Sequence, residues 1–156
     1  MFWSVLNFGK HKGKTLPQII FIDPDYFFWA IGAQVFANKG SLAQEAREID
    51  RKARNIKIPQ KTGKEQLVVE YVIDPTTGKF GDIELVPISR PPHRGSSQTF
   101  RTDKIDLSTP SRIKAYDKLG CKLMIRSVKF HLFGNENIRM TKGKCEEFFD
   151  DDNNFA

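Results

Sequence analysis

Lysines and glycines alternate near the start of the chain in a pattern that suits contact with phosphate. Gly9 and Gly13 flank a short polar stretch, and Lys10, Lys12 and Lys14 occupy every second position. Glycine readily adopts the positive φ angles of a tight turn, which can expose backbone N–H groups to an anion. Lysine ammonium groups bind phosphate oxygens without reading base sequence. We therefore predict nucleic-acid contact by Lys10, Lys12, Gly13 and Lys14, with a solvated hairpin turn as the alternative.

A second group of basic residues lies between residues 101 and 145. This segment has 11 Lys and Arg residues against four Asp and Glu residues, a net charge of +7. If these side chains share one face, they form a groove for a phosphate backbone. We expect single-stranded or structured DNA there, since no recognition-helix pattern for duplex sites is evident. The residues predicted to line this groove are Arg112, Lys114, Lys118, Lys122, Arg126 and Lys129.

The end of the chain is acidic and contains phenylalanine. Five of the 19 acidic residues lie in residues 146–156, which leaves residues 1–145 with a net charge of +11. The end resembles the acidic C-terminal tip of bacterial single-stranded DNA-binding proteins, although here Ala156 follows the last Phe. The alternative is a solubilising tail that folds back on the protein's own basic surface. The resemblance implies a flexible tail that binds a replication or repair protein through Phe149, Asp150, Asp151, Asp152 and Phe155.

Candidate catalytic groups are sparse. Asp82 and Glu84 stand two residues apart on an expected strand, where both carboxylates can share one face and hold a divalent ion. The histidines His11, His93 and His131 are dispersed without metal-ligand spacing, and we expect His11 to be solvated. No Walker loop or nucleophile elbow is present. We therefore favour a noncatalytic protein without metal or cofactor, and keep a small metal-dependent nuclease as an alternative.

Length and composition limit the protein to a modest globular body. The 156 residues are 39% hydrophobic and 28% charged, enough for one modest core or two very small ones, which excludes most multidomain enzymes. Two cysteines, Cys121 and Cys145, are too few for a disulfide framework and are expected to be reduced. No apolar run approaches the length of a membrane span, so we expect a cytoplasmic protein without membrane contact.

The N-terminal lysines belong to a predicted first unit, residues 1–58. Its expected elements are a strand over 2–8, the glycine-flanked turn, a helical turn over 17–22, and a helix that starts at Asp23-Pro24 and ends near Gly32. From Ser41, apolar residues recur at spacings of three and four, which predicts a helix of about four turns. The stripe on this helix consists of Leu42, Ala46, Ile49, Ala53 and Ile56.

The later basic residues belong to a predicted second unit, residues 64–145. Its expected elements, separated by turns and loops, are strands over 67–73 and 80–88, a helix from Thr109 to Gly120, and strands over 121–133 and 138–140. This β-β-α-β-β order predicts an antiparallel sheet with a helix on one face. The fold class is thus α+β, and the stretch 59–64 is either a linker between two domains or part of one merged core.

One ordered pattern resembles a known family. It comprises Phe8-Gly9-Lys10, Lys12-Gly13-Lys14-Thr15-Leu16, Asp23-Pro24, Tyr26 and Trp29. Over about residues 4–33 the chain resembles the small domain at the C-terminus of exodeoxyribonuclease X-like proteins, and a related group called quorum-sensing-regulated virulence-factor-like. The resemblance implies an accessory module of DNA-processing proteins and carries no nuclease activity with it.

These observations favour a noncatalytic nucleic-acid-binding accessory protein of bacterial or phage DNA metabolism. The alternative from another class is an adaptor or inhibitor that binds a protein through exposed aromatic residues and the acidic end. Tyr26, Phe27, Phe28 and Trp29 bear on this choice because four successive aromatic residues cannot all face inward on one helix. We expect most of them in the core and at least one partly exposed.

Overall fold

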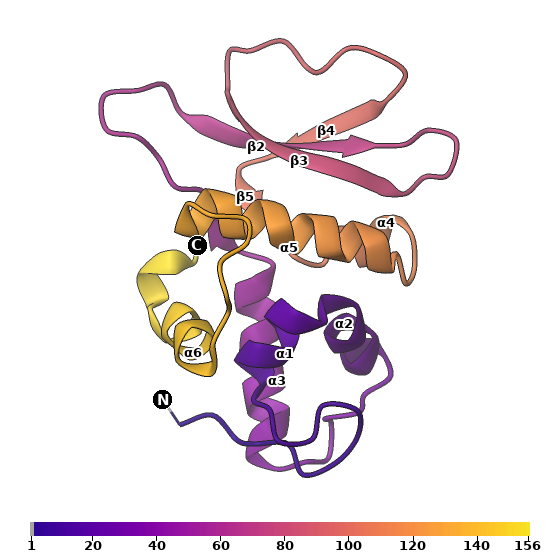
Figure 1. Ribbon diagram of the computed structural model, residues 1–156, viewed down its shortest axis with the longest axis vertical. Helices are drawn as coiled ribbons and strands as arrows, with labels where there is room; N and C mark the ends of the chain where they lie inside the picture. Colours follow the sequence, from indigo (N-terminus) through magenta and orange to yellow (C-terminus); the bar gives the residue numbers. More distant parts are fainter. Residues whose placement is uncertain (1) are drawn as a thin grey trace.

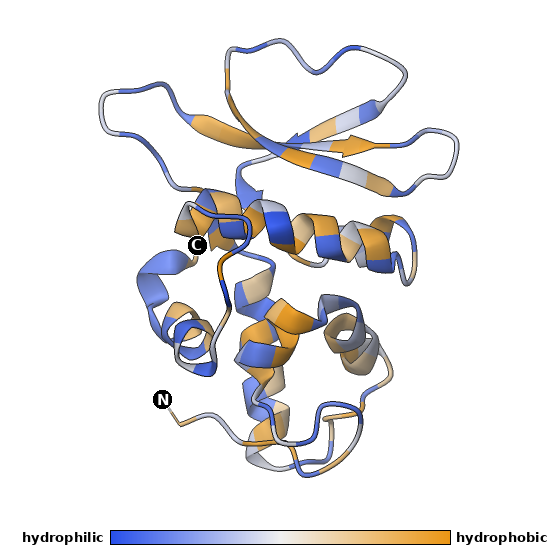
Figure 2. Cartoon of the chain, in the orientation of Figure 1, coloured by the Kyte–Doolittle hydropathy of each residue, from blue (hydrophilic) through white to orange (hydrophobic). Residues whose placement is uncertain are grey.

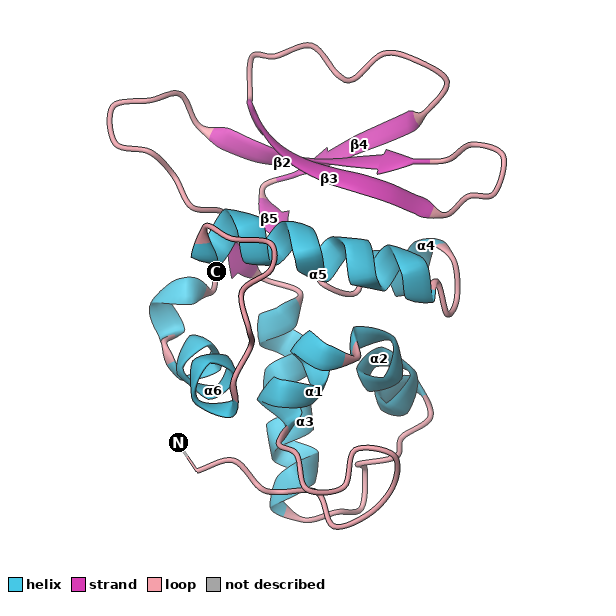
Figure 3. Cartoon of the chain, in the orientation of Figure 1, coloured by secondary structure: helices cyan, strands magenta, loops and turns pink. Residues whose placement is uncertain are grey.

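The computed structural model describes residues 2–156 and has three layers (Figure 1). A three-stranded sheet forms the upper layer, helix α5 (Lys118–Phe133) crosses beneath it, and further helices pack on the other side of α5. Figure 3 shows the same separation, with the strands of the sheet gathered above α5. The α+β class predicted from the sequence is confirmed.

The sheet is antiparallel, with β2 at its centre. Its strands β2 (Leu67–Ile73), β3 (Phe80–Pro87) and β4 (Gln98–Thr102) are ordered β3-β2-β4. Tyr71 pairs with Ile83 on one side and Phe100 on the other, and its ring is fully buried. The predicted β2–β3 hairpin is therefore confirmed, whereas the short polar strand β4 was not anticipated.

The helices before the sheet follow their sequence signals. They are α1 (Leu16–Ile22), α2 (Pro24–Gly32) and α3 (Ser41–Ala53). The Asp23 carboxylate accepts a hydrogen bond from the Tyr26 N–H at 3.2 Å, which caps α2 as its Asp-Pro start predicts. The α3 prediction is confirmed for Leu42, Ala46, Ile49 and Ala53, which are buried, whereas the helix ends at Ala53 and the buried Ile56 lies in β1 (Ile56–Lys57). Residues 2–8, in contrast, form no strand.

Helix α5 corrects the prediction of a strand over 121–133. Its buried residues Cys121, Met124, Ile125 and Val128 recur at helical spacing, while Phe130, expected inside a sheet, is 55% exposed. Asp117 caps the first turn and Gly134, with φ of 78°, ends the helix. Apolar and polar residues alternate over part of this segment, which predicted a strand. In the structure the apolar residues form one face of a helix.

Two neighbouring predictions change with α5. The helix that begins at Thr109 is only α4 (Thr109–Ile113), because Lys114 has an extended backbone, and Tyr116, with a φ of 59°, separates it from α5. Gly120, expected to end that helix, lies instead in the first turn of α5. The stretch 138–140, expected as a strand, is part of the loop that leads to α6 (Lys142–Asp150).

Buried side chains from both predicted units form one hydrophobic cluster. Phe27 and Ile49 from the first unit belong to it together with Tyr71 and Met124 from the second. In Figure 2, α1 is mostly hydrophobic, whereas hydrophobic and hydrophilic residues alternate along α5. Helix α5 is therefore the element that the sheet and the lower helices both pack against. No helix within residues 2–156 is long and apolar enough to cross a membrane.

The chain end adds to this cluster. A small second sheet pairs β1 (Ile56–Lys57) with β5 (Lys104–Ile105), and Phe155 forms a β-bridge with Ile56. The 3-10 helix η1 (Asp152–Asn154) leads into Phe155. The C-terminus therefore lies beside the middle of the molecule, as Figure 1 also shows.

Candidate nucleic-acid interface

Four basic residues follow one face of α5. Lys118, Lys122, Arg126 and Lys129 are separated by four, four and three residues, a spacing that places them in one row. The first three are exposed and Lys129 is half-buried. Within the described chain, none of the four forms a salt bridge. We call these four residues the α5 basic row.

A groove of about 570 Å³ runs beside the α5 basic row. Lys122, Arg126 and Lys129 line one wall, and the corner between α1 and α2 contributes Pro24 to the other. The loop after α5 adds Arg139, a fourth basic residue, which the sequence analysis did not select. Among the residues that line the groove, Glu136 is acidic. The groove thus presents more positive than negative charge to a bound anion.

Two residues predicted for this groove belong neither to its lining nor to the α5 basic row. The Arg112 guanidinium donates hydrogen bonds to Asp106 at 2.7 Å and to the Ser108 hydroxyl at 3.0 Å. Lys114 is exposed just after α4, and neither residue lines the groove. The structure therefore brings four of the six predicted residues into one row, and three of them, Lys122, Arg126 and Lys129, line the groove. Arg112 lies on α4 and bonds to the residues just before it, and Lys114 follows the end of that helix.

The lysine–glycine loop is closed by hydrogen bonds of its own. Gly13 N–H donates to the Leu6 carbonyl at 2.8 Å, and Lys14 N–H donates to the His11 carbonyl at 3.1 Å. Lys12 N–H likewise donates within the loop, at 3.3 Å. The turn geometry expected of its two glycines is present, since both have positive φ angles. Those three N–H groups are already used, so contact with phosphate would rest on the lysine side chains.

Asp23 holds this loop against α2. Its Oδ2 lies 2.9 Å from Lys10 Nζ and 3.1 Å from His11 Nε2. Burial pushes the pKa of Asp23 upward, but the hydrogen bonds from Lys10 and His11 outweigh it, and the pKa is lowered. His11 was expected to be solvated; instead it is 7% exposed, with its ring edge-on to Tyr26. Lys10 and His11 thus fix the loop.

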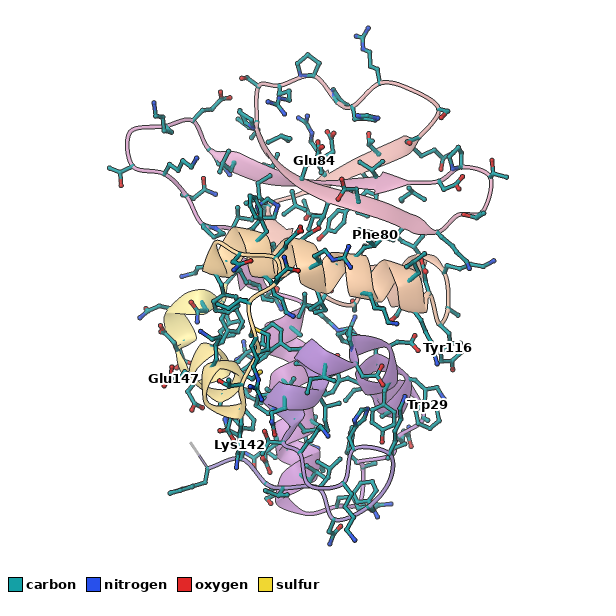
Figure 4. The ribbon with its side chains drawn as sticks, viewed as in Figure 1. Trp29, Phe80, Glu84, Tyr116, Lys142 and Glu147 are labelled. Carbon is teal, nitrogen blue, oxygen red and sulfur yellow. The ribbon has the colours of Figure 1, made fainter. Side chains whose placement is uncertain are left out.

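The aromatic run on α2 divides between core and surface. Phe27 and Phe28 are buried, Tyr26 is half-buried, and Trp29 is 42% exposed. The expectation that at least one ring is partly exposed is confirmed. In Figure 4, the labelled Trp29 side chain points away from the helical core. Trp29 is therefore available for contact with a ligand.

The acidic end is folded, which corrects the prediction of a flexible tail. Phe149 is fully buried and Phe155 is 6% exposed, and their rings stack with centroids 5.5 Å apart. Lys52 Nζ donates to the Phe149 carbonyl at 2.7 Å and lies 3.0 Å from Asp152. The phenylalanines that were expected to bind a partner are thus core residues, because their apolar area outweighs the charge beside them. The acidic residues lie on the surface around them.

Asp82 and Glu84 both lie on β3. Glu84 pairs across the strands with Glu70. Within residues 2–156 no group of three or more His, Cys, Asp or Glu side chains could hold a metal ion. His131 shares a pocket with both carboxylates, and burial, although opposed by the charge of Asp82, lowers its pKa. The described residues therefore provide two neighbouring carboxylates but no metal-binding cluster.

Comparison with known families gives one match, to a short segment of the chain. Residues 6–34 match the family model for the exodeoxyribonuclease X-like C-terminal domain, in agreement with the resemblance noted in the sequence. The matched segment covers the lysine–glycine loop, α1 and α2. Comparisons with curated proteins and with solved structures found no match. The family hints at a role related to nucleic acid.

Proposed function

We propose that this protein is a noncatalytic nucleic-acid-binding accessory protein that holds a single strand against α5. The observation that supports the proposal is the α5 basic row, of which Lys122, Arg126 and Lys129 line a groove together with Arg139. The four basic side chains of the row can each contact one of the regularly spaced phosphates of a nucleic-acid backbone. Release of counterions from that backbone would drive binding without sequence preference.

The matched family segment supports the proposal from a second direction. Its helix α2 begins at Pro24, which lines the groove opposite Lys122 and Arg126. The exodeoxyribonuclease X-like segment and the α5 basic row therefore form two walls of one surface. This arrangement suits an accessory module of DNA metabolism, as the family resemblance implies. Lys12 and Lys14 belong to the same matched segment but do not line the groove, so their contact with a strand is a separate part of the proposal.

A salt titration tests the proposal directly. Binding of a fluorescent 12-residue deoxythymidine strand is followed by anisotropy between about 30 and 300 mM salt. Each phosphate contact contributes about −0.7 to the slope of log K against log salt for single strands. We expect a slope near −3 for the four residues of the row. A flat response, or no binding at the lowest salt, would contradict the proposal.

Charge-neutralising variants locate the interface. A triple variant with Lys122→Gln, Arg126→Gln and Lys129→Gln removes three charges from the groove, and the expected slope is about two units shallower. The matched control neutralises three basic residues outside the groove, and its affinity should stay within about twofold of the unmodified protein. These control residues are Arg47, Lys61 and Lys64, all exposed. Equal losses in both variants would mean that the charge of the whole protein, and not the groove, attracts the strand.

Recruitment of a replication or repair protein by residues 146–156 is a separate part of the proposal. Because Phe149 and Phe155 are buried, only the acidic surface around them is open to a partner while the end stays folded. Deletion of residues 146–156 would remove the partner contact but also expose the core. The informative variant is therefore Asp151→Asn with Glu147→Gln, both exposed. Loss of partner capture with unchanged strand affinity would support recruitment, and unchanged capture would contradict it.

A further inference from the structure

A second hollow lies between α2 and the α4–α5 connection, at the N-terminal end of the α5 basic row. It has a volume of about 420 Å³, and its lining includes Asp25, Phe28, Trp29, Ser111 and Tyr116. Figure 4 shows the labelled Trp29 and Tyr116 side chains on the same side of the molecule, one from each wall. They are 42% and 59% exposed. We call this hollow the aromatic cleft.

The backbone holds Tyr116 in an unusual conformation at the rim of the cleft. Its φ of 59° lies in the left-handed region, which an aromatic residue rarely adopts. Asp117 follows directly and is fixed by its hydrogen bonds to the N–H groups of Gly120 and Phe80. The strained residue is therefore held by its neighbours, and strain of this kind is concentrated at ligand sites. It leaves a large aromatic side chain in contact with solvent.

Asp25 supplies an unused hydrogen-bond acceptor. The residue is 6% exposed, and among the described residues nothing donates a hydrogen bond to its buried Oδ1. Burial raises the pKa of Asp25, although the nearby charge of Lys118 acts in the opposite direction. Buried carboxylate oxygens almost always have partners in folded proteins. A ligand N–H group placed in the cleft would provide one.

The charges around the cleft indicate what kind of ligand carries that N–H group. Asp25 interacts electrostatically with Lys118 and Lys10, and also with the carboxylates of Asp23 and Asp117, so it lies near the N-terminal end of the α5 basic row. A nucleotide combines a planar N–H-bearing base, which can face Asp25, with an anionic phosphate, which can face Lys118 and the rest of the row. Exposed aromatic rings are the usual stacking surfaces for bases of single strands. The three features together fit a nucleotide unit.

We propose that the aromatic cleft takes up one unstacked base that carries an exocyclic amino group, such as cytosine, and that Asp25 accepts a hydrogen bond from this group. Trp29 and Tyr116 provide the stacking surface, while the phosphates of the strand continue along the α5 basic row. The inference rests on the proposed function. Thymine lacks the amino group and has only its ring N3–H as a donor, so the inference adds a base preference that backbone contact alone does not produce.

The test compares 12-residue deoxycytidine and deoxythymidine strands at one salt concentration. The unmodified protein should bind the cytidine strand at least fivefold more tightly. Asp25→Ala should bring this ratio close to one without weakening binding of the thymidine strand, since the variant removes a negative charge. Trp29→Leu and Tyr116→Leu should each lower affinity for the cytidine strand at least fivefold. The control Phe130→Leu alters an exposed aromatic residue outside the cleft and should change nothing.

A second measurement separates failure of the cleft from failure of the groove. Cytidine and thymidine monophosphate are titrated into labelled protein, and the indole N–H signal of Trp29 is followed by NMR. A shift with the cytidine nucleotide that Asp25→Ala abolishes supports the cleft, even if no strand binds. Equal affinity for both strands together with no such shift would contradict base binding in the cleft. A steep salt dependence in the same protein would still support strand binding at the α5 basic row.

Discussion

The Asp117 carboxylate joins the sheet to α5 by accepting a hydrogen bond from the Phe80 backbone N–H, with 3.0 Å between Oδ2 and N. Its other oxygen accepts from the Gly120 N–H at 3.0 Å and so caps α5. Asp117 is 2% exposed, and both bonds are buried. One side chain therefore fixes both the start of the basic helix and its position under β3.

Replacement of Asp117 should strongly destabilise the protein. Asp117→Ala removes the cap of α5 and leaves the buried Phe80 N–H without its partner, for an expected loss of about 2 to 4 kcal/mol. Chemical denaturation followed by circular dichroism measures this loss. The control Asp103→Ala removes an exposed carboxylate and should change the unfolding free energy by less than about 0.5 kcal/mol. Similar values for the two variants would show that Asp117 does not join the elements as described.

Gly120 should be intolerant of any side chain. A Cβ at this position would lie 2.5 Å from Asp117 Oδ2 and 3.0 Å from the Phe80 Cβ. Gly120→Ala should therefore cost about 1 to 3 kcal/mol, although alanine favours helices. In Gly143→Ala the new Cβ would meet no atom within 4 Å, and this control in α6 should gain about 0.5 to 1 kcal/mol. Thermal melts of the two variants should shift in opposite directions.

The contrast between α3 and α5 explains what could be predicted from sequence. In α3 charged residues separate the apolar residues at spacings of three and four, so the pattern fits a helix and does not fit the alternation of a strand. In α5 the exposed Phe130 and the half-buried Leu123 and Leu132 mimic a strand. The signals that would have corrected this were the capping residues Asp117 and Gly134 at its two ends.

The candidate site was predictable only in part, for the same reason. If residues 118–133 are assigned to a helix, the spacing of Lys118, Lys122, Arg126 and Lys129 predicts that they share one face. Arg139 and Asp25 reach their sites through tertiary packing that no local pattern contains. The acidic end was misread because its charges were given more weight than its three phenylalanines, which belong to the core.

The C-terminal phenylalanines should contribute to stability as core residues do. Phe155→Ala opens a cavity beside Phe149 and Phe148, and we expect a loss of about 3 kcal/mol. The same variant should make the chain end sensitive to limited proteolysis. Phe2→Ala is the control because Phe2 is fully exposed and should have almost no effect. An unchanged melting temperature for Phe155→Ala would contradict this role and would support the flexible tail that the sequence predicted.

Asp23 and Asp25 should affect the pH dependence of stability in opposite directions. The pKa of Asp23 is lowered, so its contribution is present above the ordinary value of 3.8 and is lost as pH falls through the lower folded value. Asp23→Asn should therefore destabilise the protein at pH 7, by about 1 kcal/mol, but much less near pH 2. Melting temperatures measured from pH 2 to pH 7 give this difference.

For Asp25 the sign reverses, because burial raises its pKa above 3.8. The folded state then favours the protonated form, and the ionised carboxylate costs stability at neutral pH. Asp25→Asn should raise the melting temperature at pH 7 by about 3 °C, which corresponds to roughly 1 kcal/mol. The gain should disappear as pH falls through the folded pKa to below 3.8. A loss of stability at pH 7 would mean that the carboxylate has a partner in the folded protein.

The two cysteines should be unreactive until the protein unfolds. Burial raises the pKa of Cys121 to about 11 and that of Cys145 to about 12, so little thiolate exists at pH 8. Iodoacetamide should modify neither residue in the folded protein and both in denaturant, as measured by mass spectrometry. A Ser96→Cys variant provides an exposed thiol as the control and should react within minutes. Rapid modification of Cys121 in the folded state would mean that α4 separates from α5, because the Ser111 hydroxyl lies 3.7 Å from its sulfur.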